Sequence, residues 1–171
     1  NRVAALQAPR IQPGYMSQDA FYRAYFDTNS PVYRAFHSIE GFGTPREMST
    51  PAAWQCASPA KGGVASARGL AQFYQVLMSD FIPAEVREWL ATPQCSGWDL
   101  TLQQHTSFTC GAMCEPAHLF PGGGFGHAGA GGSHAFCSPV SGISFAYVMN
   151  RMELGNLPGA RVETLLELLP C

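Results

Sequence analysis

Apolar residues recur at helical spacing through the first half of the chain, which predicts a run of short helices. Ser17, Ser30 and Ser66 are each placed to cap a helix, with Pro31 in the first turn after Ser30, and Pro83 opens a fourth helix. These four helices are expected within 18–26, 32–37, 62–80 and 83–91. The third is expected to bury a stripe formed by Leu70, Phe73, Tyr74 and Leu77.

The second half of the chain changes to alternating apolar and polar positions, which are typical of strands. Residues 100–113 predict one strand, and residues 133–139 and 143–152 predict a hairpin across the turn "PVSG". A final helix is predicted near the C-terminus, with Val162, Leu165, Leu166 and Leu169 on one face. Residues 92–98, "TPQCSGW", are interpreted as the end of a helix. The pattern therefore predicts an α+β fold, with helices first, then an antiparallel sheet, then a C-terminal helix.

Composition supports one domain over residues 1–171 and excludes two classes of function. Hydrophobic residues make up 46% of the chain, enough for a core, and no linker or repeat divides it. Charged residues make up only 13%, the net charge is −2, and no basic cluster is present, so nucleic-acid binding is not expected. No apolar run approaches the ~20 residues that a membrane span needs. Without an initiator methionine, the chain is expected to begin within a longer protein or after processing.

The six cysteines are too sparse to form a disulfide scaffold in a chain of 171 residues. Their pairing and the cellular compartment stay open. "CGAMCEPAH" places Cys110, Cys114 and His118 at spacings that resemble a metal site. Structural zinc normally takes four ligands, and no second pair stands nearby, so buried or paired thiols are preferred and no metal is predicted. The cysteines are Cys56, Cys95, Cys110, Cys114, Cys137 and Cys171.

The segment "GHAGAGGSHAFCSP", residues 126–139, carries the most distinctive chemistry. A phosphate-binding loop would lead into a helix, whereas these glycines lead into a predicted strand. Small residues would let a substrate carbonyl approach a backbone N–H to hydrogen-bond distance. The alternative is that the glycines only relieve crowding and His127 is a core histidine. His134, inside the strand, is interpreted as structural.

Three segments together resemble the C-terminal half of the serine β-lactamase-like superfamily, which includes class C β-lactamases, penicillin-binding proteins and esterases. They are "GGVASARGLAQFYQVL", "FGHAGAGGSHAFCSPVSGISFAYVMNRM" and the C-terminal amphipathic helix. The resemblance is strongest from Gly62 onward. It is closest to the branch that has His-x-Gly where β-lactamases have Lys-Thr-Gly.

The resemblance implies roles for residues 127–131. It places "HAG" on an edge strand of the central sheet, with His127, Ala128 and Gly129 at the Lys, Thr and Gly positions. The Ala130 N–H would complete the oxyanion hole, and Gly131 would line the substrate site with residues 127–129. His127 would donate to a substrate carboxylate or tune proton transfer. Because Ala128 lacks the hydroxyl that penicillin-recognising members use, an ester or peptide-like substrate is favoured. No cofactor is implied.

The nucleophile is not evident in these residues. Members of the superfamily use Ser-x-x-Lys at a helix start, so that the lysine can accept the serine proton. The chain has one match, Ser58 to Lys61, but Gly62 and Gly63 follow at once and would break the helix. Tyr-x-Asn, Ser-x-Asn and Gly-x-Ser-x-Gly elements are absent from the sequence.

Two functions follow from this resemblance as expectations. In the first, the chain is the C-terminal part of a serine hydrolase that cleaves a small ester or amide through an acyl-enzyme. The serine would come from a missing N-terminal segment, so the chain alone would be inactive. It would pair with the complementary half or self-associate, because an unpaired sheet edge is exposed otherwise. In the second, the chain is a non-catalytic binding or scaffold module.

Overall fold

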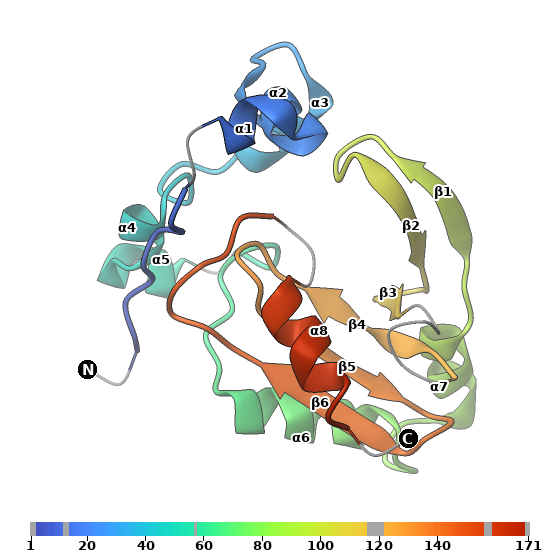
Figure 1. Ribbon diagram of the computed structural model, residues 1–171. Helices are drawn as coiled ribbons and strands as arrows, with labels where there is room; N and C mark the ends of the chain where they lie inside the picture. The colour runs from blue at the N-terminus through green and yellow to red at the C-terminus, as the bar shows by residue number, and fades with distance from the viewer. Residues whose placement is uncertain (1–2, 12–13, 57, 116–121, 156–158, 170–171) are drawn as a thin grey trace.

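Helices occupy the first half of the chain and an antiparallel sheet the second, as the hydrophobic pattern predicts (Figure 1). The computed structural model describes residues 3–11, 14–56, 58–115, 122–155 and 159–169. The helices are α1 (Tyr15–Gln18), α2 (Ala20–Phe26), α3 (Pro31–Phe36), α4 (Pro45–Met48), α5 (Pro51–Gln55), α6 (Ala67–Leu77), α7 (Ala84–Ala91) and α8 (Ala160–Leu166). The strands are β1 (Cys95–Asp99), β2 (Gln104–Phe108), β3 (Met113–Glu115), β4 (Gly124–Ala128), β5 (His134–Ser138) and β6 (Ile143–Tyr147).

Two of the predicted helix caps are confirmed by their hydrogen bonds. The Ser30 hydroxyl accepts from the Tyr33 N–H at 2.9 Å, and the Ser66 hydroxyl accepts from the Gly69 N–H at 3.1 Å. Each cap satisfies a backbone donor that has no partner inside its helix. The starts of α3 and α6 are therefore set by local sequence.

The cap predicted at Ser17 is wrong, because α2 begins two residues later. The Asp19 carboxylate accepts from the Tyr22 N–H at 3.0 Å and caps α2, while Tyr15–Gln18 form the separate turn α1. Asp is as good a cap as Ser, and the sequence pattern does not distinguish the two positions.

The strands of the sheet are arranged in chain order, β1 to β6, and each pairs antiparallel with the next. The predicted hairpin is confirmed as β5 and β6. Of the strand predicted over 100–113, only residues 104–108 form one strand, β2, and Met113 begins β3. The sequence pattern does not predict β1, because four of its five positions are exposed and show no alternation of apolar residues.

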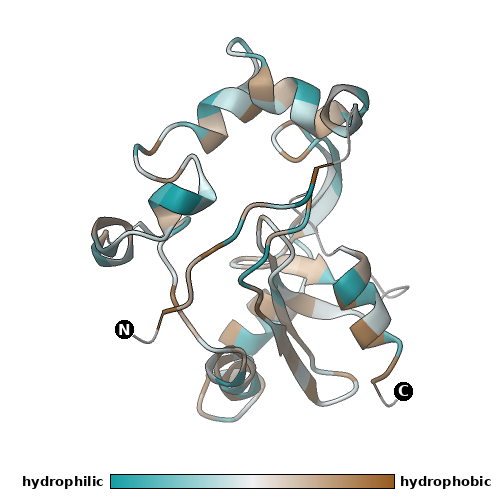
Figure 2. Cartoon of the chain, turned by 60° about the vertical axis from the view of Figure 1, so that its left-hand side comes forward, coloured by the Kyte–Doolittle hydropathy of each residue, from teal (hydrophilic) through white to brown (hydrophobic). Residues whose placement is uncertain are grey.

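Helices cover both faces of the sheet, so the core has two layers. On one face Phe136 packs with Val162 and Leu166 of α8. On the other face Phe125 and Cys137 pack against side chains of α6 and α7. Figure 2 shows hydrophobic residues on the strands between these helices. In the described residues, no helix is both long and apolar enough to cross a bilayer.

The apolar stripes predicted for α6 and α8 are correct only in part. Tyr74 and Leu77 pack on the sheet, but Phe73 is 55% exposed. Val162 and Leu166 are buried in α8, whereas Leu165 is 37% exposed. A short helix that covers one face of a sheet buries fewer positions than the full apolar arc of its sequence.

The five described cysteines are free thiols, and Cys137 alone among them is buried. Burial raises the pKa of the Cys137 thiol to about 12. The thiolate is the species that reacts with alkylating reagents, and at pH 9 a thiol with that pKa is ionised in only about one molecule in a thousand.

We therefore expect iodoacetamide at pH 9 to modify the exposed Cys56, Cys95 and Cys110 in the folded protein while Cys137 stays unmodified. Peptide mass spectrometry before and after unfolding in urea measures this difference. Rapid modification of Cys137 without denaturant would contradict the packing of β5 against α6.

Candidate functional site

The candidate site lies at the C-terminal end of β4 and in the turn that joins it to β5. β4 is an internal strand of the sheet, between β3 and β5, so the expectation that "HAG" lies on an edge strand is wrong for the strand as a whole. The pairing with β3 nevertheless ends at Met113 and Gly126. His127 and Ala128 extend beyond it and pair only with Ala135 and His134 of β5. This end of β4 has a locally free edge.

The hydrogen-bond pattern determines which backbone groups face that edge. The Gly129 N–H donates to the Ser133 carbonyl at 2.6 Å, toward β5. Successive residues of an antiparallel ladder point their N–H groups to opposite sides, so the N–H of Ala128, the last residue of β4, points away from β5. Ala130 lies beyond the ladder, in the turn closed by the hydrogen bond from the Gly132 N–H to the Gly129 carbonyl at 3.1 Å. Ala130 is exposed, and its N–H has no acceptor among the described residues. It is a backbone donor open to a ligand.

Glycines hold the turn around Ala130 in one conformation. Gly131 and Gly132 have φ angles of 88° and 102°, which residues with a side chain rarely adopt. The Gly131 N–H donates to the Gly155 carbonyl at 3.1 Å, and its carbonyl accepts from the Glu153 N–H at 2.8 Å. A Cβ atom at Gly131 would lie 2.6 Å from the Met152 side chain. Gly131 is thus buried, and its backbone hydrogen bonds to segment 150–155 support the turn.

That support reaches to the start of the chain. The Gln7 N–H donates to the Asn150 carbonyl at 2.6 Å, and the Met152 N–H donates to the Gln7 carbonyl at 3.0 Å. The Tyr22 hydroxyl accepts from the Gly155 N–H at 2.7 Å, and burial raises the pKa of this tyrosine. Segment 150–155 therefore supports the turn through hydrogen bonds to Gly131. Gln7 and Tyr22, both near the start of the chain, hydrogen-bond this segment in turn.

His127 is exposed beside the free edge of β4. Its Nδ1 lies 2.6 Å from the Ala128 carbonyl oxygen. A carbonyl only accepts, so Nδ1 carries the hydrogen and Nε2 is left to accept a proton or, when protonated, to donate one. The ring centroid lies 6.3 Å from that of Phe108 in β2.

His134 is buried, as the interpretation of a structural residue predicts, but its partner is not evident from the sequence. Its Nε2 lies 2.7 Å from Oε1 of Glu115, and both side chains are buried. The pair links β3 to β5 across β4. Gly124 and Gly126 leave the intervening strand without side chains on that face, and a Cβ at either would collide with the β5 backbone. A lone glutamate between Cys114 and Pro116 carries no sequence signal of this contact.

Ser58 and Lys61 lie in the loop between α5 and α6, in agreement with the glycines that follow them. The Lys61 Nζ donates to the Phe36 carbonyl at 2.6 Å and lies over the Phe36 ring, and burial lowers the pKa of this amine. The Ser58 hydroxyl is buried and has no hydrogen-bond partner among the described residues. The helical stacking of lysine under serine that a Ser-x-x-Lys centre needs is therefore not formed here.

Of the three residues considered for a metal, His118 lies outside the described residues. The part of the chain that the structure describes contains no group of three or more His, Cys, Asp or Glu side chains placed to hold a metal ion. The Cys114 Sγ instead accepts from the Ser107 hydroxyl at 3.3 Å.

Comparison with known proteins connects this geometry to a family. A family VIII carboxylesterase superposes with a TM-score of 0.69 at 21% identity, over 97% of this chain and 42% of that one. A penicillin-binding protein homologue from Caulobacter crescentus gives a TM-score of 0.55 at 25% identity, over 72% of this chain and 39% of that one. EstA from Arthrobacter nitroguajacolicus Rue61a gives 0.54 at 24% identity, over 74% and 39%. The chain thus spans about two fifths of the length of these structures.

No curated protein sequence matches the chain. The profile of the beta-lactamase family matches residues 4–168, almost the whole of the sequence. With that match, and with the sheet and helices that these structures share, the chain belongs to the beta-lactamase family of serine hydrolases.

Proposed function

We propose that this chain forms the oxyanion side of a serine hydrolase that cleaves a small ester or amide through an acyl-enzyme. A serine hydroxyl attacks the substrate carbonyl, a C–O bond forms, and the carbonyl oxygen becomes a tetrahedral oxyanion. Collapse of this intermediate expels the alcohol or amine and leaves the acyl-enzyme. Water then attacks the acyl-enzyme and releases the carboxylic acid and the free serine.

The observation that supports this proposal is the N–H of Ala130 in the turn that follows the free end of β4, which has no acceptor among the described residues. A fixed backbone donor stabilises an oxyanion more than a neutral carbonyl, and it needs no reorganisation when charge develops. The glycine turn and segment 150–155 hold this amide in place, and the small side chains of Ala128 and Gly129 leave room for a carbonyl to approach.

His127 is proposed to act beside that amide. With Nδ1 donating to the Ala128 carbonyl, Nε2 is free to hydrogen-bond the leaving group or a substrate carboxylate. A neutral imidazole accepts a proton and an imidazolium returns it, so the same nitrogen serves in both steps. Ala128 supplies no hydroxyl for a β-lactam carboxylate, and this favours esters and simple amides as substrates.

The nucleophile is proposed to come from polypeptide outside these 171 residues. Ser58 is the only serine in the sequence with a Ser-x-x-Lys spacing. The amine of Lys61 already donates a hydrogen bond to the Phe36 carbonyl. The chain would then pair with the region that bears the serine, and by itself it would not turn over an ester.

Labelling with a fluorophosphonate, which reacts with activated serines, tests the proposal. The protein as its source produces it and the 171-residue chain alone are each incubated with the probe and analysed by intact mass and peptide mapping. We expect one adduct in the former, on a serine outside this chain, and none in the latter. An adduct on Ser58, lost in Ser58→Ala, would make "SPAK" the active centre and overturn the proposed source of the nucleophile. Absence of labelling in both would instead identify a non-catalytic binding module.

A further inference from the structure

The hairpin of β1 and β2 carries a surface hollow beyond the candidate oxyanion site. Its lining residues are Cys95, Ser96, Gly97, Trp98, Asp99, Thr106 and Phe108. Alternation along the strands places Cys95, Gly97 and Asp99 on one face of β1, opposite Phe108 and Thr106 of β2. Gly97 has open space where a side chain would stand. A side chain at Gly97 would therefore project into open space beside the other lining residues.

The wall of the hollow offers apolar surface and no free charge. Asp99 is the only charged residue among the described residues that line the hollow, and its carboxylate already accepts hydrogen bonds within the hairpin. Oδ1 accepts from the N–H groups of Thr101 and Leu102 at 2.7 and 2.9 Å, and Oδ2 accepts from the Thr106 hydroxyl at 3.4 Å. A carboxylate held this way repels an anionic ligand and has little capacity to bind a cation. Phe108 presents its ring on the same face as Gly97, and this ring favours an uncharged apolar group.

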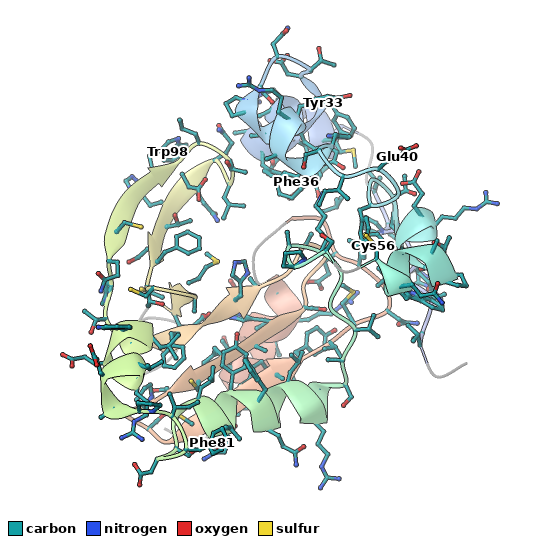
Figure 3. All side chains as sticks on the ribbon, turned by 180° about the vertical axis from the view of Figure 1, so that it is seen from behind. Tyr33, Phe36, Glu40, Cys56, Phe81 and Trp98 are labelled. Atoms are coloured by element: carbon teal, nitrogen blue, oxygen red, sulfur yellow. The ribbon has the colours of Figure 1, made fainter. Side chains whose placement is uncertain are left out.

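One side chain connects this hollow with the candidate site. The Phe108 ring forms part of the lining, and its centroid lies 6.3 Å from the imidazole of His127. Phe108 thus borders both the hollow and the surroundings of His127. Figure 3 shows Trp98 on this hairpin, on the opposite side of the molecule from Cys56.

We propose that the hollow of the β1–β2 hairpin is the subsite for an uncharged aromatic or short aliphatic group of the substrate, with Gly97 as the residue that sets the size of that group. This inference rests on the proposed hydrolase function for the identity of the ligand. Binding of the group to the hollow does not itself require catalysis, so an experiment can refute the subsite without refuting the hydrolase function, and the reverse.

Butyranilide, the amide analogue of phenyl butyrate, is the probe, because the 171-residue chain by itself is not expected to cleave it. It is titrated into the ¹⁵N-labelled 171-residue chain and followed by amide chemical shifts. We expect saturable shifts in β1, β2 and His127. The variant Gly97→Leu, which places a side chain in open space without a positive φ, should weaken binding at least tenfold by filling the hollow. Succinanilate, which ends in a carboxylate, should bind at least tenfold more weakly than butyranilide.

Gly63→Leu is the matched control, because Gly63 also has open space and lies outside the hollow, in the loop before α6. It should bind butyranilide like the original chain, and the dispersion of the spectra verifies that both variants fold. Shifts that map elsewhere, an unchanged affinity in Gly97→Leu, or no binding up to the solubility limit would each overturn the subsite. If butyranilide binds as expected while fluorophosphonate labelling fails, the hollow stands as a binding site and the hydrolase proposal falls.

Discussion

Replacing Ala130 with proline is expected to lower kcat/KM for ester hydrolysis by about 100- to 1,000-fold in the assembled hydrolase, because it removes one oxyanion donor. The Ala130 N–H has no acceptor among the described residues, so its loss breaks no hydrogen bond that they form. The loss should appear mainly in kcat, since the donor bonds more strongly to the oxyanion than to the ground-state carbonyl. Steady-state kinetics with p-nitrophenyl butyrate measure the effect.

Ala130→Gly retains the N–H and is the control, with an expected change in kcat/KM of less than about threefold, because the oxyanion donor is still present. Proline also restricts the backbone, so a second variant replaces the Ala130 amide with an ester linkage by semisynthesis and removes only the N–H. Thermal unfolding verifies that each protein is folded. Activity that survives in both the proline and the ester-linked protein would exclude Ala130 as an oxyanion donor.

Replacing Glu115 with alanine is expected to lower the free energy of unfolding by about 1–3 kcal/mol, the cost of leaving the buried His134 side chain without its hydrogen-bond partner. Among the described residues, the His134 side chain has one hydrogen-bond partner, the Glu115 carboxylate at 2.7 Å from Nε2, and its Nδ1 has none. The variant would leave a buried imidazole with both nitrogens unsatisfied, and burying such groups without a hydrogen bond costs free energy. Urea unfolding followed by circular dichroism provides the measurement.

The double variant Glu115→Leu/His134→Leu is the informative comparison. Removal of both polar groups leaves neither side chain buried and unpaired, so it should recover most of the stability that Glu115→Ala loses. A change below about 1 kcal/mol in the single variant would mean that His134 finds other partners, such as water, and that the pair does not hold β3 to β5.

Elements with a strong local signal were predicted well, and their contacts explain why. Ser30 and Ser66 cap their helices through bonds to residues three positions away. The β5–β6 hairpin likewise depends on strands that follow one another across a short turn. In each case the interacting residues are close in sequence, so spacing and residue type carry the information.

Errors arose where the local pattern was weak or ambiguous. β1 is mostly exposed and has a glycine at its centre, so it lacks the alternation by which a strand is recognised. Asp19 and Ser17 are both good caps that the sequence pattern does not distinguish, and in the structure Asp19 caps α2. The edge position expected for "HAG" failed for another reason: strand order depends on β1–β3, whose pairing the local pattern does not specify.

By itself, the amino-acid sequence determined the α+β class, the capped helices, the final hairpin and the glycine segment at residues 126–139, because each rests on neighbours in the chain. Only the tertiary structure decided the surroundings of that segment. It joined Glu115 to His134 over 19 positions and Gln7 to Arg151 over 144, and it ended the β3 pairing at Gly126. Such contacts form when distant segments pack, and local residue patterns do not record which segments meet. The open N–H of Ala130 follows from that packing.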